Sequence, residues 1–281
     1  MSQSAVHSRW LVSGLLALVV MIPHAQGQVR PEDYMTVRQG QLPILVTAPH
    51  GGQKLIPGVA MRQQGVAAKL VLTPDEHTDA LAEKLASDLQ SRLGRAPFLI
   101  VAQFDRRQVD ANREERDAFD QPGGSEVKSL YTAYHQAVAA ACAEIEKTWG
   151  RGLLIDVHGQ SAEPDGIFRG TVNGQSVSLL LREKGPDAIV GPNGVMGALT
   201  RKGYRIIPDM AVDKDDPRFP GRYTVRTYGS HTGRRIDAIE FEIGNRLRAP
   251  DRLEATARDI GEAVSGFARA YLSLDGPRPK P

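Results

Sequence analysis

Two histidines that each precede a glycine are the strongest candidates for chemistry in this chain of 281 residues. His50 follows the largely apolar residues 43–49, and His158 follows residues 152–157, whose one acid is Asp156. Apolar runs of this length are typical of buried strands, and ligand sites in open α/β sheets form beyond the carboxyl ends of the strands. Catalytic zinc binds three protein ligands, for which imidazole and carboxylate groups are suited. The pattern predicts a metal held between the two histidines, with a pair of hydrogen-bonded loop histidines as the alternative.

The third ligand is expected from Asp75 or Glu76. The stretch Thr73-Pro74-Asp75-Glu76 has the N-cap, the first-turn proline and the third-position glutamate of a capping box, which predicts a helix that begins here. This box explains Glu76 without any metal, and an acid in the first turn also suits the helix dipole. Both acids therefore stay open as ligands at this point.

A third candidate group lies near residues 236–244, where apolar and acidic residues alternate. In a strand this alternation places Glu240 and Glu242 on one face. An inward carboxylate at a strand end can act as a general base toward a metal-bound water, and a surface acid on an edge strand is the alternative. Arg226 and His231 come shortly before this strand and are candidates for contacting the substrate or an oxyanion.

Asn112 and Arg113 follow the predicted strand 97–104 and are candidates for holding a substrate carboxylate. The guanidinium of arginine is a planar fork that fits a carboxylate, and the amide of asparagine adds a further donor. Several other charged residues lie beside them, so a solvated charged loop is the alternative.

The elements that must position these groups alternate between helices and apolar strands. This order predicts a single α/β domain with a mainly parallel sheet that is covered on both faces. A lid or pocket wall is expected at residues 208–222, and a hairpin turn at Asn173-Gly174. The main helices are expected from Thr73 to Gly94, at 126–149 and at 250–273, and further strands at 204–207, 223–228 and 236–244.

The two ends of the chain are expected to lie outside this domain. Arg9, the apolar residues 11–22 and the small residues at 25–27 predict a signal peptide, 1–27, that is cleaved after Gly27. The apolar run is shorter than the ~20 residues that a membrane span needs, so no stable membrane insertion is expected after cleavage. The predicted location is periplasmic or secreted, with a catalytic domain at 28–274 and a disordered proline-rich tail at 275–281.

The overall composition narrows the function classes. The net charge of +2 gives no electrostatic reason to expect nucleic-acid binding. The single cysteine, Cys142, cannot form a disulfide within the chain, so stability has to come from the hydrophobic core.

Five short motifs, taken together, resemble the N-formylglutamate amidohydrolase family over most of residues 43–248. The resemblance implies a fold similar to that of zinc carboxypeptidases: a zinc-exopeptidase (phosphorylase/hydrolase)-like three-layer α/β/α domain with a mixed, mainly parallel sheet of about eight strands. The His-x-x-Glu ligand pair of the carboxypeptidases is absent, because Gln53 occupies its fourth position. The motifs are Ala48-Pro49-His50-Gly51-Gly52, Asp75-Glu76-His77-Thr78, Val109-Asp110-Ala111-Asn112-Arg113, Asp156-Val157-His158-Gly159-Gln160 and Ile239-Glu240-Phe241-Glu242-Ile243.

Carried over residue by residue, the resemblance implies one Zn²⁺ per chain, held by His50, Asp75 and His158. Glu242 matches the general base, and Asn112 with Arg113 matches the pair that grips a substrate carboxylate.

The predicted function is a zinc-dependent amidohydrolase that cleaves the amide bond of an N-formyl or N-acyl amino acid, or of a small peptide that carries a carboxylate. Zinc would bring the pKa of its water toward ~7, and Glu242 would take the proton. Zinc with Arg113 or Arg226 would stabilise the oxyanion, and His231 is a further substrate contact.

Two alternatives from other classes stay open. A two-metal phosphoester hydrolase would use the paired units Asp75-x-His77 and Asp156-x-His158. A non-catalytic periplasmic carboxylate-binding protein would need no metal.

Overall fold

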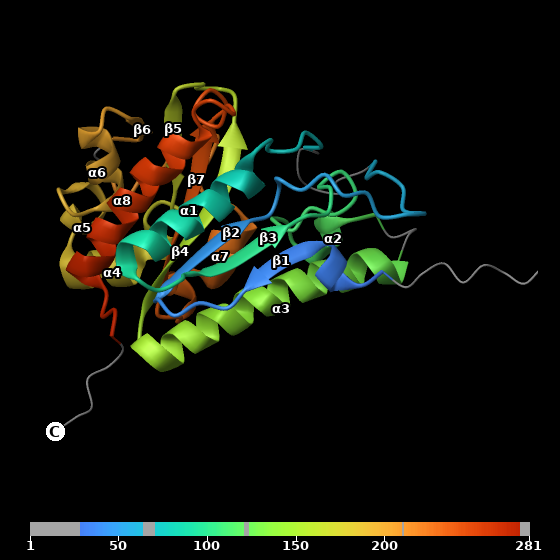
Figure 1. The fold of residues 1–281 in the computed structure, drawn as a ribbon, viewed down its shortest axis with the longest axis horizontal. Coiled ribbons are helices and arrows are strands. Elements are labelled where there is room, and N and C mark those ends of the chain that lie inside the picture. Colours follow the sequence, from blue (N-terminus) through green and yellow to red (C-terminus); the bar gives the residue numbers. More distant parts are fainter. Residues whose placement is uncertain (1–28, 64–70, 121–123, 210, 276–281) are drawn as a thin grey trace, which may run out of the picture.

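A computed structural model of the chain describes residues 29–63, 71–120, 124–209 and 211–275. The predicted signal peptide and all but the first residue of the predicted tail lie outside the described residues. The described residues form one α/β domain whose mixed sheet has seven strands in the order β1-β3-β2-β4-β7-β5-β6 (Figure 1). The strands are β1 Met35–Arg38, β2 Ile44–Ala48, β3 Phe98–Ala102, β4 Gly152–Gln160, β5 Gly166–Gly170, β6 Arg205–Ile207 and β7 Ile236–Gly244.

The centre of the sheet is parallel, as predicted. Strands β3, β2, β4 and β7 run in the same direction, while β1 pairs antiparallel with β3 and β5 pairs antiparallel with β7. All residues of β2 and β3 and nearly all of β4 and β7 are buried, because helices cover both faces.

Two hydrophobic clusters separate the three layers. One packs alternate residues of β2 (Ile44, Val46, Ala48) against α1 and α8, and the other packs Leu45 against α3. Figure 1 shows α1 and α8 on one side of the sheet and the long helix α3 on the other. The helices are α1 Thr78–Leu93, α2 Glu115–Ala118, α3 Gly124–Trp149, α4 Ser178–Lys184, α5 Asp187–Val190, α6 Val195–Arg201, α7 Tyr223–Tyr228 and α8 Leu253–Tyr271, with short 3₁₀ turns η1 Pro31–Asp33, η2 Gln175–Val177 and η3 Ser230–Thr232.

The predicted start of the first long helix is wrong. Helix α1 begins at Thr78 rather than at the expected capping box, and the residue before it, His77, has a left-handed backbone with φ 65°. The backbone amide and the hydroxyl of Thr78 both donate to the carbonyl of Asp75. Asp75 therefore lies in a turn ahead of the helix, and its carboxylate is not used as a helix cap.

Three further local predictions need correction. Residues 223–228 form helix α7 and not a strand, and Met35–Arg38, where no strand was predicted, form the edge strand β1. Asn173 and Gly174 do make a turn, but it leads into η2, because β5 pairs with β7 and β6 rather than with a hairpin partner. No helix within the described residues is both long enough and apolar enough to span a bilayer.

Candidate active site

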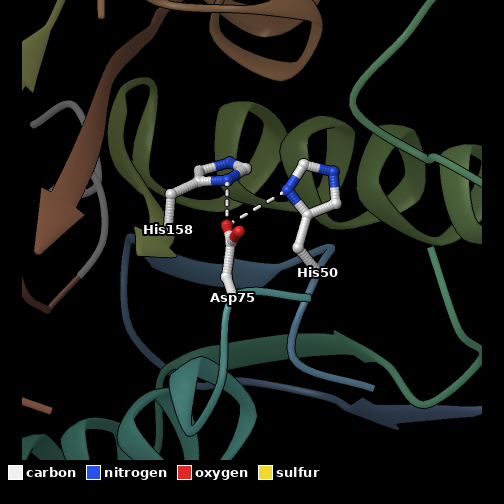
Figure 2. Close-up of side chains that lie close together, drawn as sticks. All are labelled: His50, Asp75 and His158. Atoms are coloured by element: carbon white, nitrogen blue, oxygen red, sulfur yellow. Dashed lines mark hydrogen bonds and ion pairs between the residues drawn. The ribbon is translucent and has the colours of Figure 1, made fainter. Parts of the chain in front are cut away.

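His50, Asp75 and His158 converge at the carboxyl edge of the sheet (Figure 2). His50 comes two residues after the end of β2, and His158 lies near the end of the neighbouring parallel strand β4. The carboxylate oxygen Oδ2 of Asp75 lies 3.2 Å from Nδ1 of His50 and 3.2 Å from Nδ1 of His158. The pairing of β2 with β4 thus brings two imidazoles that are far apart in sequence to one carboxylate.

The glycine after His50 is required by close packing against backbone, and the glycine after His158 packs against an arginine side chain. A side chain at Gly51 would collide with the backbone of Asp79 at the start of α1, and one at Gly159 would collide with the guanidinium of Arg248. These close approaches let the turn that carries Asp75 sit directly over the strand ends.

Each histidine is fixed from behind by a buried aspartate. Nε2 of His50 lies 2.6 Å from Oδ1 of Asp110, and Nε2 of His158 lies 2.9 Å from Oδ2 of Asp156. An ionised carboxylate accepts only, so each Nε2 carries the hydrogen and each Nδ1 presents a lone pair toward Asp75. Metal-binding histidines commonly have this arrangement, in which a carboxylate on the far nitrogen sets the tautomer and the ring orientation.

The three inward atoms fit a zinc ion. Two imidazole lone pairs and a carboxylate oxygen are all acceptors, and they lie within 4.8 Å of one another. Ligands at ~2.1 Å from a tetrahedral zinc are separated by about 3.4 Å, close to the 3.2 Å from each Nδ1 to Asp75. A cation between these atoms resolves the repulsion of converging acceptors.

The surrounding charges also favour a positive charge here. Burial alone would lower the pKa of His158, but Asp156, Asp75 and Glu240 together raise it well above its ordinary value. Burial alone would raise the pKa of Asp75, but His50, His158 and Arg106 hold it below its ordinary value. Arg106 is buried and bridges the two acids, with 3.0 Å contacts to Asp75 Oδ1 and to Asp110 Oδ2.

Glu242 lies next to this cluster. Strand β7 is interior to the sheet, between β4 and β5, so the alternative of a surface acid on an edge strand is wrong. Glu242 pairs in register with His158 and lines a cavity of about 130 Å³ together with all three converging residues. Burial raises the pKa of Glu242 well above its ordinary value, Glu240 and Asp75 add to the rise, and His158 and Arg106 oppose it.

Both residues expected to hold a carboxylate line the cavity. Arg113 lines it, with Nε 3.6 Å from Asp110 Oδ2. Asn112 also lies at the cavity wall but is buried, and its side-chain groups are engaged with the protein. Its Oδ1 accepts from the amide (2.8 Å) and the hydroxyl (3.1 Å) of Thr224. Its Nδ2 donates to Glu240 at 3.3 Å and lies 3.1 Å from Nε2 of His158.

Arg226 and His231 do not line the cavity, contrary to expectation. Both are exposed, and Nε of Arg226 donates to the carbonyl of Gly221. His231 lies in η3, which comes just before the first residue of β7, at the opposite end of that strand from Glu242. Residues 223–228, predicted as a strand, fold as helix α7, and His231 follows in η3.

The predicted pocket wall at residues 208–222 contributes Arg218, Phe219 and Arg222 to the cavity. The guanidinium of Arg218 pairs with Asp216 and stacks on Phe168, 4.7 Å from the ring centre. Arg222 forms no ion pair within the part of the chain that the structure describes, and its Nη2 donates to the carbonyl of Arg218 at 3.3 Å. The sequence signal for these residues was a long loop that carries arginines ahead of β7.

Comparison with known proteins agrees with the resemblance drawn from the motifs. A protein named N-formylglutamate deformylase from Pseudomonas aeruginosa is 22% identical over 275 residues, which cover 86% of this chain and 95% of that protein. The crystal structure of N-formylglutamate amidohydrolase from Ralstonia eutropha matches with a TM-score of 0.58 at 17% identity, over 84% of this chain and 98% of that one. A gene product of Agrobacterium tumefaciens matches with a TM-score of 0.53 at 17% identity, over 83% and 95% of the two chains. No protein-family model matches the chain. The shared fold confirms the α/β architecture that the motifs implied.

Proposed function

We propose that this protein is a zinc-dependent amidohydrolase that cleaves the amide bond of a small N-formyl or N-acyl amino acid, or of a short peptide, that carries a carboxylate. The observation that carries the proposal is the convergence of two Nδ1 atoms on Asp75 while each Nε2 is held by a buried aspartate. The name of the Pseudomonas relative and the shared fold support the same reaction class.

His50, Asp75 and His158 would hold the zinc. When bound there, zinc supplies a Lewis acid that polarises a carbonyl group and lowers the pKa of water toward ~7. Glu242 takes the proton from the attacking water and returns it to the nitrogen of the leaving amine. Its burial suits the first of these steps, because a carboxylate with a raised pKa is a stronger base toward the attacking water.

The guanidinium groups at the cavity mouth would bind the substrate carboxylate. Arg113 lines one part of the cavity and Arg222 another, and Arg222 has no acid partner among the described residues. Phe219 adds an apolar surface to the same wall. Arg222 thus takes the substrate-binding role that the sequence assigned to Arg226.

The test combines a metal assay with one conservative change. Glu242→Gln is expected to bind one zinc per chain, as the unmodified protein does, and to lose 10²–10⁴-fold in turnover of N-formyl-L-glutamate or of another N-acyl amino acid. Glu83→Gln, a partly exposed glutamate on α1, is the matched control and should leave turnover unchanged. Unchanged turnover in Glu242→Gln would contradict the base assignment.

The two-metal alternative draws support from a second group of possible ligands, Asp156, His158 and Glu240. The paired units from the sequence do not both form, because His77 is exposed and only Asp75 of its unit reaches the site. Two metals per chain in the purified protein would favour this alternative, and one metal favours the amidohydrolase. Catalytic activity would argue against a simple carboxylate-binding protein.

We further propose export to the periplasm or to the medium, which rests on the sequence of residues 1–27, outside the described part of the chain. Sequencing of the mature protein from its source should start at Gln28. A mature chain that begins at Met1 would contradict cleavage.

A further inference from the structure

Glu240 is a buried acid for which the proposed reaction has no use. It is fully buried on β7, and Oε2 lies 3.9 Å from Nε2 of His158. Two donors point at the same oxygen: the backbone amide of Arg222 at 2.8 Å and Nδ2 of Asn112 at 3.3 Å. Its other oxygen, Oε1, has no hydrogen-bond partner among the described residues.

Asn112 makes a similar contact with the backbone of the cavity wall, two residues after Arg222. Its Oδ1 accepts from the backbone amide of Thr224 at 2.8 Å and from the hydroxyl of Thr224 at 3.1 Å. Glu240 and Asn112 together therefore satisfy the amides of residues 222 and 224, at the point where the pocket-wall loop enters α7. We call this pair of side chains the Asn112–Glu240 bracket.

The bracket joins the wall to the rigid part of the site. Glu240 comes from the interior strand β7, whose neighbour β4 carries His158, and Asn112 comes two residues after Asp110, which holds His50. The wall itself is an irregular loop, which cannot fix a side chain as tightly as a strand can. A buried carboxylate that accepts two hydrogen bonds fixes the backbone of Arg222 in relation to the converging histidines.

We propose that Glu240 and Asn112 are positioning residues that hold the backbone at Arg222, so that its guanidinium faces the cavity and sets the affinity for an anionic substrate. The inference rests on the proposed function for the zinc and for the identity of the substrate. The hydrogen bonds that hold Arg222 and Thr224 are independent of any reaction.

The first experiment measures the bracket without substrate. Hydrogen exchange of the amides of Arg222 and Thr224 is compared between the zinc-loaded protein and the variants Glu240→Ala and Glu240→Gln. The alanine variant should exchange the Arg222 amide about tenfold faster, which corresponds to the loss of one hydrogen bond. The glutamine variant should keep the protection, because its amide oxygen can replace Oε2 and its nitrogen can occupy the place of Oε1. Unchanged exchange in the alanine variant, or equal loss in both variants, would overturn the proposal.

The second experiment asks whether the bracket acts through Arg222. With N-formyl-L-glutamate as the probe, Glu240→Ala should raise KM about tenfold more than it lowers kcat, while the zinc content stays at one per chain. In the background of Arg222→Met the same change should have no further effect on KM, because linked residues are not additive. If the increases in KM from Arg222→Met and Glu240→Ala multiply in the double variant, or if Glu240→Ala loses zinc, Glu240 supports His158 instead and the proposal is overturned. Absence of turnover in the unmodified protein would count against the proposed function, and the exchange experiment would still decide the bracket.

Discussion

The two histidines of the site are held in the same geometry by opposite kinds of surroundings. Behind His50, Asp110 lies among guanidiniums: Arg106 at 3.0 Å, Arg62 at 3.4 Å and Arg113 at 3.6 Å. Behind His158, Asp156 accepts from the hydroxyl of Thr47 at 2.6 Å and has a second buried acid, Glu240, in the same cluster. Asp156 pairs with no arginine or lysine within the described residues.

The site therefore has two halves, one made of His50 with the groups behind it and one made of His158 with the groups behind it, and they differ in how their charges are balanced. Burial alone would raise the pKa of Asp110, but His50 and the arginines hold it well below its ordinary value, so this acid stays ionised with or without a metal. Burial raises the pKa of Glu240, Asp156 adds to the rise and His158 opposes it, so the positive charge in that half comes from the imidazole or from the metal. The His50 half is therefore a structural ion-pair network that also carries a ligand, whereas the His158 half depends on what binds at the site.

The largest effect is expected at Asp75, the contact that both halves share. Asp75→Asn replaces the carboxylate oxygen between the two Nδ1 atoms with an amide group, which is a poor zinc ligand. Zinc affinity, measured by competition with a chelator of known strength, should fall by more than the 10–100-fold that a change in an outer partner costs.

Glu76→Gln is the matched control for this change, because the neighbouring acid is exposed and was the other candidate for the third ligand. It should leave zinc affinity unchanged. Equal losses in the two variants would mean that the turn before α1 moves when the metal binds.

An intermediate effect should distinguish the two supporting aspartates. Asp110→Asn leaves Arg62 buried without its carboxylate and Arg106 with Asp75 alone, and breaking a buried pair in this way costs about 3–5 kcal/mol. Asp156→Asn leaves no guanidinium without a partner and removes one of two neighbouring buried acids. The loss in the free energy of unfolding should therefore stay within about 1–2 kcal/mol. Urea denaturation of the two variants in the presence of a chelator measures the difference.

Zinc affinity is the internal control for this pair. Both variants should lose about 10–100-fold, because each one removes the carboxylate that sets the tautomer of a ligand histidine. If the two variants unfold at the same urea concentration, the proposed division into a structural half and a metal-dependent half is wrong.

Sequence patterns were sufficient to predict the positions of side chains that lie on regular strands or directly after them. His50 and His158 come at the ends of apolar runs that pair as parallel strands, and the position of Glu242 follows from the alternation along β7. The same patterns misplaced Arg226 and His231, because the choice between strand and helix at 223–228 depends on tertiary contacts such as those of Thr224 with Asn112. Arg106 was missed because a charged pair after a strand looks the same in sequence whether it is solvated or bridges two buried acids.

The capping-box pattern shows why the third ligand stayed open. Its residues fit a helix start in every local respect, yet the chain continues through a left-handed His77 before α1 begins. This conformation is stabilised by partners that are distant in sequence, because the carboxylate of Asp75 contacts Arg106 and also accepts from the amide of Gly159. No local propensity includes such contacts.

A further effect, confined to acidic pH, concerns a third imidazole, His135 on α3, which contacts neither histidine of the site directly. Its Nε2 donates to the carbonyl of Ala111, between Asp110 and Asn112, and burial lowers its pKa to about 4. Below about pH 6.5 the unfolded chain therefore binds a proton at His135, whereas the folded chain binds it only near pH 4. The contribution of His135 to the free energy of unfolding is therefore complete above pH 6.5 and is lost as the pH falls to 4. At ~1.36 kcal/mol per pKa unit, the loss is at most about 3 kcal/mol. His135→Gln keeps a donor for Ala111 and should flatten the stability curve over this range in chelator, while His77→Gln, at an exposed position, should not. A curve for His135→Gln as steep as that of the unmodified protein would contradict the assignment of this acid sensitivity to His135.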